Sequence, residues 1–128
     1  MNMKLSEVIF RSNVLANLAD KRLPYKLSYA ISKNLSKFQD EMKLINEGKN
    51  RIVEEYALKD EDGRIKTKDD KYDFGDNKEV AESEYQSYME TETEVNILTV
   101  PMSVLEIEDS RFDVLTVAQV VALDFMME

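Results

Sequence analysis

Carboxylates are the most numerous side chains in this sequence that could bind a ligand or act in catalysis, and one dense group is DEDGRI at residues 60–65. An EF-hand calcium loop needs carboxylates at positions 1, 3 and 5, glycine at position 6 and glutamate at position 12. With Gly63 at position 6, position 1 becomes Leu58 and position 9 becomes Lys66. The pattern therefore favours an acidic turn over a calcium site, and we expect no metal and no other cofactor.

Most catalytic side chains are missing from the sequence, which contains no histidine and no cysteine. This excludes a Ser–His arrangement, a cysteine nucleophile, the commonest general base and the usual ligand sets of zinc. An enzyme would have to work with a carboxylate pair, as many glycosidases do. The sequence predicts no pocket around such a pair, so we expect a protein that is not an enzyme.

A second acidic group lies between residues 79 and 94. Its six glutamates are Glu79, Glu82, Glu84, Glu90, Glu92 and Glu94. On a helix they would span about four turns, and some of their spacings would resemble phosphates along a nucleic-acid backbone. Such a surface could occupy the basic groove of a nucleic-acid-binding enzyme. A solvated helix surface explains the same residues, and both interpretations stay open.

Six cations lie on the predicted helix 24–58, namely Lys26, Lys33, Lys37, Lys43, Lys49 and Arg51. We expect them to pair with the glutamates of a neighbouring helix rather than with nucleic acid, although each such exposed pair contributes only about 0–1 kcal/mol. Among the aromatic residues, Tyr25, Tyr72 and Phe74 have no obvious internal partner. They are therefore candidates for contact with another protein, together with Glu82, Glu84, Glu90 and Glu94.

The longest periodic segment runs from Pro24 to Leu58 and predicts one long helix. Apolar residues recur along it at spacings of three, four and seven, and these residues are Ile31, Leu35, Phe38, Met42, Ile45, Ile52 and Tyr56. This is the seam of a coiled-coil-like helix, with one polar interruption at Lys49. Proline suits the first helical turn, and Gly48 marks a position where the helix could bend.

A second helix over residues 77–93 is predicted to lie antiparallel on the distal half of the first. Its seam residues are Ala81, Tyr85, Tyr88 and Val95, and Asp76 with Glu79 resembles a capping box. Residues 59–76 between the two helices are rich in Asp and Gly and predict a β-hairpin or loop at the tip of the arm.

Two further helices complete the predicted fold. A helix over residues 7–20 has Ser6 as its N-cap, and an apolar helix over residues 117–127 begins with the capping box Thr116–Gln119. Residues 95–107 are β-leaning and extended, with Pro101 confining them to an edge or splitting them. The fold class is therefore mainly α with minor β. It has four helices, and the C-terminal helix is expected to pack on the first helix and on the start of the long one.

The chain of 128 residues is expected to form one domain, residues 1–128. Its net charge is −9, and the sign is unevenly distributed. Residues 1–58 carry ten Lys/Arg and seven Asp/Glu, whereas residues 59–128 carry seven and nineteen. A negative surface repels phosphates, so we expect no direct nucleic-acid binding. No segment has the length or apolarity of a membrane span or signal peptide, so we expect an intracellular protein that binds no membrane.

Four blocks of the sequence resemble a family of small proteins encoded by phages and prophages of Gram-positive bacteria, a family catalogued as a domain of unknown function. These blocks are KRLPYKLSYAISKN (21–34), YALKDEDGRI (56–65), TEVNI (93–97) and TVAQVVALDFMME (116–128). The resemblance covers most of the chain. It implies a phage setting and location in the host cytoplasm or with the virion, and it carries over no active site.

From these features we expect a phage protein that acts by binding another protein through the arm and its tip. Its task would be an accessory role in virion assembly or the modulation of a host factor. The alternative is an anti-defence inhibitor, similar to an anti-CRISPR, whose acidic surface competes for the nucleic-acid channel of a host nuclease. A homo-oligomer is also compatible with the exposed apolar seams.

Overall fold

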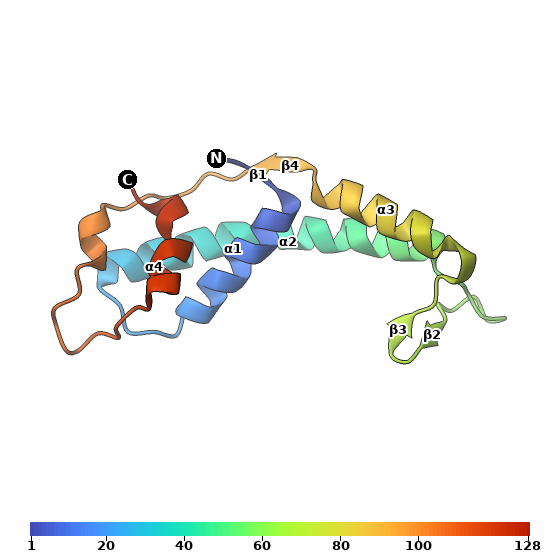
Figure 1. Cartoon of the computed structure of the whole chain (residues 1–128), viewed down its shortest axis with the longest axis horizontal. Coiled ribbons are helices and arrows are strands. Elements are labelled where there is room, and N and C mark those ends of the chain that lie inside the picture. The colour runs from blue at the N-terminus through green and yellow to red at the C-terminus, as the bar shows by residue number, and fades with distance from the viewer.

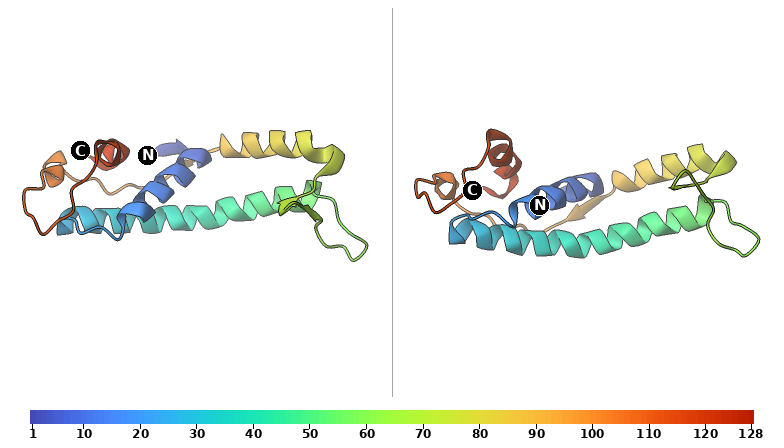
Figure 2. Two further views of the ribbon diagram at one scale, coloured as in Figure 1. Left: turned by 60° about the horizontal axis from the view of Figure 1, so that its bottom comes forward. Right: turned by 90° about the horizontal axis from the view of Figure 1, so that it is seen from below.

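The computed structural model describes all residues, 1–128, and is an elongated, mainly helical molecule (Figure 1). Helix α2, Tyr25–Tyr56, contains 32 residues and runs along most of its length. At 1.5 Å per residue this helix is about 48 Å long. Helix α3, Lys78–Met89, lies antiparallel along the distal half of α2, and both views of Figure 2 show this pair. The predicted fold class is confirmed.

Helix α1, Leu5–Leu18, crosses the proximal half of α2 and starts two residues earlier than predicted. Ser6 is not its N-cap. The N-cap is Lys4, whose backbone N–H donates to the Glu7 carboxylate at 3.3 Å. The helix can begin early because the preceding residues are held in a strand, β1, Asn2–Lys4.

Strand β1 pairs antiparallel with β4, Glu92–Glu94, in the register Asn2↔Glu94 and Lys4↔Glu92. The Met1 ammonium adds a hydrogen bond of 2.9 Å to the Val95 carbonyl. The predicted C-terminal end of the second arm helix, residue 93, is therefore wrong. Helix α3 stops at Met89, and the next residues turn to join the N-terminus.

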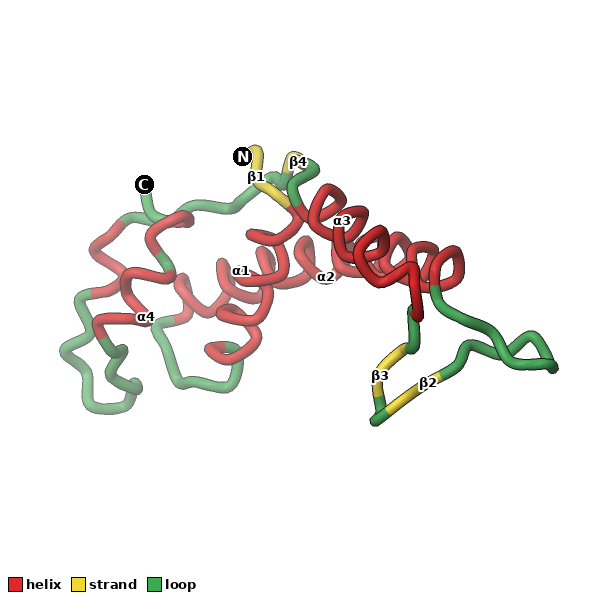
Figure 3. The backbone as a smooth tube through the Cα atoms, turned by 45° about the vertical axis from the view of Figure 1, so that its right-hand side comes forward, coloured by secondary structure: helices red, strands yellow, loops and turns green.

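The C-terminal quarter covers the proximal end of α2 with short elements (Figure 3). These are the 3-10 helix η2, Met102–Leu105, the α-helix α4, Val117–Ala122, and the 3-10 helix η3, Asp124–Met126. The Thr116–Gln119 capping box is confirmed, but the regular helix has only six residues. Residues 95–99 form neither a strand nor a helix, and Val100 forms a single parallel bridge with Met127. The predicted extended segment thus ends at Pro101, where η2 begins.

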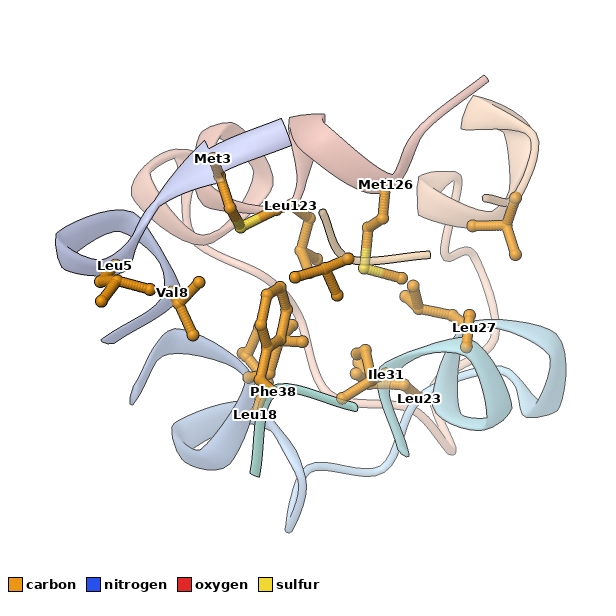
Figure 4. Close-up of a cluster of buried hydrophobic side chains, with 14 of the residues drawn as sticks. Met3, Leu5, Val8, Leu18, Leu23, Leu27, Ile31, Phe38, Leu123 and Met126 are labelled. Carbon is orange, nitrogen blue, oxygen red and sulfur yellow. The ribbon is translucent and has the colours of Figure 1, made fainter. Parts of the chain in front are cut away.

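The core lies at the proximal end, where α1, the first half of α2 and the C-terminal elements meet (Figure 4). Phe38 is completely buried and contacts Phe125 edge-to-face at 5.9 Å between ring centroids. The Arg11 guanidinium lies 4.7 Å from the centroid of Phe125. These contacts confirm that the C-terminal segment packs on α1 and the start of α2.

The predicted seam of α2 also faces the packed side of the helix. Ile31, Phe38 and Ile45 are buried, and the other seam residues are partly buried. The helix runs unbroken through Gly48. A side chain there would meet Tyr88, because an added Cβ would lie 2.1 Å from the Tyr88 hydroxyl oxygen. Gly48 therefore allows α3 to approach closely.

Candidate functional site

The tip of the arm, residues 57–77, is a folded connection between α2 and α3. Its first turn is held by Asp60, whose Oδ1 accepts hydrogen bonds from the N–H groups of Asp62 at 2.9 Å and Arg64 at 3.0 Å. Gly63 has a φ of +78°, which favours glycine. The DEDGRI motif thus makes an acidic turn in which one carboxylate organises the backbone, and Lys59 and Ile65 form a β-bridge across it.

A β-hairpin follows, as the sequence predicts. It consists of β2, Thr67–Lys68, and β3, Lys71–Tyr72, joined by Asp69 and Asp70. Both turn residues have positive φ, 53° and 63°. Two-residue hairpin turns with both central residues in this region match the twist of the strands, and aspartate tolerates the conformation better than most residues.

The hairpin is tied to the end of α2 by backbone hydrogen bonds. The Leu58 N–H donates to the Asp73 carbonyl, the Asp73 N–H to the Lys66 carbonyl and the Lys66 N–H to the Leu58 carbonyl, at 2.8–3.0 Å. Gly75, with φ +53°, lies against Leu58, since an added Cβ would be 2.8 Å from its Cδ1. The tip is therefore better anchored than its short strands suggest.

The hairpin folds back over the helix pair and forms a groove of about 1180 Å³, the tip groove. Its apolar and aromatic lining residues are Ile52, Val53, Tyr72, Phe74, Ala81 and Tyr85, and the rest of its lining is polar or charged. Tyr72 and Phe74 pack edge-to-face at 6.5 Å between centroids, and Tyr72 is 52% exposed. The Lys49 ammonium lies 5.8 Å from the centroid of Tyr85. The groove can accept an apolar or aromatic side chain between cations and carboxylates.

The predicted contact residues fall into separate places. Tyr72, Phe74 and Glu82 line the tip groove. Tyr25 lies at the opposite end of α2, is 83% exposed, and packs edge-to-face on Phe112 at 6.5 Å. The expectation that Tyr25 and the Tyr72/Phe74 pair lack internal partners is therefore wrong, although both tyrosines keep large exposed surfaces.

The six glutamates do not form one helical row. Glu79, Glu82 and Glu84 are on α3, Glu90 is the C-cap residue, and Glu92 and Glu94 are on β4. The predicted capping box is also wrong, because the N-cap is Asn77, which makes no side-chain cap hydrogen bond. Asp76 instead belongs to a 3-10 turn, η1, Gly75–Asn77. The glutamates are nonetheless exposed, and among them only Glu90 has an ion partner, Lys4 at 4.0 Å.

The expected ion pairs between α2 and α3 are absent. No cation of α2 forms an ion pair within 4.0 Å. Lys49 lies over Tyr85, Lys33 lies over Tyr29, and the Lys37 ammonium donates to the Asn96 carbonyl. Exposed ion pairs gain little over hydration, so long lysine side chains settle on aromatic faces and carbonyls instead.

Two tyrosines at the interface of α2 and α3 have altered acidity. Tyr88 donates to the carbonyls of Leu44 and Ile45 at 3.1 and 3.3 Å, and burial raises the pKa of its hydroxyl above 10.0. The pKa of Tyr56 is also raised, by desolvation and by the nearby carboxylates of Glu55 and Glu84. Both hydroxyls therefore remain neutral beyond the pH at which a free tyrosine ionises.

Asn34 is a key residue that sequence reasoning missed. Its side chain is fully buried, and its amide pairs with the backbone of Leu98, with Nδ2 donating to the carbonyl at 2.9 Å and Oδ1 accepting from the N–H at 2.8 Å. The available signal is its place on the apolar side of α2, four residues before Phe38. A polar residue there needs a partner.

Comparisons with known proteins give no match: no family model, curated protein or solved structure resembles this chain. No group of three or more Asp or Glu residues converges in a way that could hold a metal ion. Likewise, none of the helices combines the length and the apolar character that crossing a membrane would need.

Proposed function

We propose that this chain is a phage protein without enzymatic activity that acts by binding another protein through the tip groove. The observation that carries the proposal is the groove itself, with Tyr72 and Phe74 on one side and the α2–α3 pair on the other. Aromatic residues that remain partly exposed around a concave surface are typical anchors of protein interfaces.

The shape of the molecule supports this use of the tip. The tip stands at the far end of the arm from both chain termini (Figure 1), so a large partner can reach it without touching the body. The phage setting rests on the resemblance of residues 21–34, 56–65, 93–97 and 116–128 to a phage and prophage family. Virion assembly and modulation of a host factor in the host cytoplasm are the two tasks compatible with it.

The experiment is an affinity capture with tagged protein from lysates of a phage-infected and an uninfected Gram-positive host. Captured proteins are identified by mass spectrometry, purified and titrated directly against the wild type. The tip variant Tyr72→Ser/Phe74→Ser is compared with Tyr29→Ser, a control in the first half of α2 whose tyrosine is 60% exposed, against 52% for Tyr72. We expect the tip variant to lose capture and the control to keep it. Equal capture by both variants would contradict the proposal.

An anti-defence inhibitor remains a second candidate because Glu82, Glu84 and Glu94 are exposed and form no ion pair. An acidic surface of this kind competes for a basic nucleic-acid channel through screened electrostatic contacts. The captured partner would then be a host nuclease, released at high salt, and Glu82→Lys/Glu84→Lys/Glu90→Lys would abolish binding. A tip-groove interface built on Tyr72 and Phe74 would change little with salt.

A further inference from the structure

A basic and aromatic surface covers the first half of α2, away from the tip. Residues 21–39 contain five Lys/Arg and no Asp/Glu, in a chain with a net charge of −9. Tyr25 and Tyr29 are 83% and 60% exposed there, and the Lys33 ammonium lies 5.9 Å from the centroid of Tyr29. This surface is opposite in sign to the protein as a whole.

Three lysines of this surface share one face of the helix and are called the basic stripe: Lys26, Lys33 and Lys37. They are separated by seven and four residues, which places them one above another on an α-helix. None of them forms an ion pair within 4.0 Å, although Lys37 donates to the Asn96 carbonyl. The positive charge of the stripe is therefore not neutralised by the chain's own carboxylates.

Three glutamates on α3 and at its C-cap form a matching acidic stripe: Glu79, Glu82 and Glu90. They are separated by three and eight residues and also share one face of the helix. All three are exposed. The acidic stripe cannot reach the basic stripe of its own chain, because α3 lies along the distal half of α2 (Figure 1).

The two stripes have the same length and complementary spacing. The two ends of each stripe are eleven positions apart, which is about 16 Å on a helix. When the two helices run antiparallel, the glutamate spacings of eight and three residues lie opposite the lysine spacings of seven and four residues. Each glutamate then falls within one residue, about 1.5 Å along the axis, of a lysine. We propose that the acidic stripe of one copy docks on the basic stripe of a second copy, in a head-to-tail contact.

The contact is heterologous, because it joins two different surfaces. A pair of bound copies keeps one free basic stripe and one free acidic stripe, so the contact repeats into an open row of copies or a closed ring. Since α3 is antiparallel to its own α2, the α2 helices of successive copies run parallel and are staggered along their axes. This inference goes beyond the proposed function: Tyr72 and Phe74 are not part of the contact, and Glu82 is the one residue that the acidic stripe shares with the tip groove.

The first test is sedimentation velocity of the wild-type protein at increasing concentration. Exposed ion pairs are individually weak and are screened by salt, so we expect association only at high protein concentration and low salt. In about 50 mM salt the weight-average mass should rise past that of a dimer, and in about 500 mM salt it should fall back to that of one chain. A single-chain mass at about 1 mM protein in low salt would overturn the proposal.

Charge reversal gives the sharper test. Lys26→Glu/Lys33→Glu and Glu82→Lys/Glu90→Lys should each be monomeric alone, because two of the three facing pairs then have like charges. An equimolar mixture should associate again, since both kinds of contact between the two variants pair opposite charges. Failure of the mixture to associate would overturn the proposal even if each variant is monomeric.

Two matched controls change the charge equally elsewhere. Lys43→Glu/Lys66→Glu and Glu106→Lys/Glu108→Lys alter exposed residues outside both stripes and should associate as the wild type does. Far-UV circular dichroism verifies that every variant is folded. A fluorescent single-stranded oligonucleotide is added in parallel. If the wild type remains monomeric and binds it through Lys26 and Lys33, the surface belongs to a nucleic-acid ligand and the proposal fails.

Discussion

The body and the distal arm differ sharply in how they are built. Eighteen of the twenty buried residues lie outside the distal arm, residues 46–88, and only Ala57 and Ala81 are buried within it. The body therefore holds most of the burial that stabilises the fold. The distal arm depends on a helix pair, backbone hydrogen bonds and partly exposed aromatic rings. Because of this division, side chains of the tip groove can change without a large cost to folding.

The strongest way to break this comparison is to remove the centre of the body core. Phe38→Ala removes a fully buried ring that contacts Phe125, and we expect it to lower the free energy of unfolding by about 3–5 kcal/mol. Urea denaturation followed by circular dichroism measures this. Phe10→Ala is the control, because its ring is 63% exposed and should cost less than about 1 kcal/mol. Similar losses of stability in both variants would contradict a core centred on Phe38.

A smaller effect is expected at Asn34. Asn34→Leu keeps a similar volume but leaves the partly buried N–H and carbonyl of Leu98 without their side-chain partner. An unsatisfied buried polar group costs about 1–3 kcal/mol, so unfolding should become easier by that amount. Asn50→Leu, an exposed position on the same helix, is the matched control. Amide exchange of Leu98 should also accelerate, and unchanged exchange would mean that the pairing does not hold this segment.

The close approach of α3 to α2 can be tested by a double-mutant cycle at Gly48 and Tyr88. Ala is favoured over Gly in a helix by about 1 kcal/mol, but a Cβ at residue 48 collides with the Tyr88 ring. Gly48→Ala should therefore destabilise the wild type and stabilise Tyr88→Ala. The diagnostic result is that the effect of Gly48→Ala on stability has opposite signs in the two backgrounds. A gain in stability in both backgrounds would mean that α3 does not approach α2 so closely.

The smallest expected effect is a loss of stability at alkaline pH. The pKa values of Tyr88 and Tyr56 are raised in the folded protein, so the folded state holds these protons more tightly than the unfolded state does. Their contribution to stability is complete below pH 10 and is lost as the pH rises through the folded pKa values. Thermal unfolding midpoints measured from pH 8 to 11 should fall less in Tyr88→Phe than in the wild type. If the midpoints of the variant and the wild type fall by the same amount, Tyr88 is not a source of the effect.

The sequence predicts the long helix and the hairpin well, because both have local signals. The α2 seam repeats from Ile31 to Tyr56, over about seven turns, and the tip is marked by Asp and Gly residues that favour turns. The pairing of β1 with β4 has no such signal. Two three-residue strands about ninety positions apart are selected by tertiary packing, and α3 ends before them without a glycine stop.

Only part of the candidate site can be predicted from the sequence, because the rest depends on tertiary packing. Tyr72 and Phe74 can be chosen from sequence, since they alternate with charged residues beside turn residues. The tip groove cannot, because it exists only when the hairpin folds back over Ile52, Val53 and Tyr85. The predicted ion pairs between α2 and α3 of one chain are absent, because charge sign and helix identity do not fix the positions of long, hydrated side chains.

The most direct measurement tests binding and stability on one variant, Tyr72→Ser/Phe74→Ser. Its urea midpoint and its affinity for the captured partner are measured beside the wild type. We predict a midpoint close to that of the wild type and an affinity reduced at least tenfold, which corresponds to about 1.4 kcal/mol. Retained affinity would contradict a binding role for the tip groove. A large fall in the midpoint would contradict the division between a stabilising body and a binding arm.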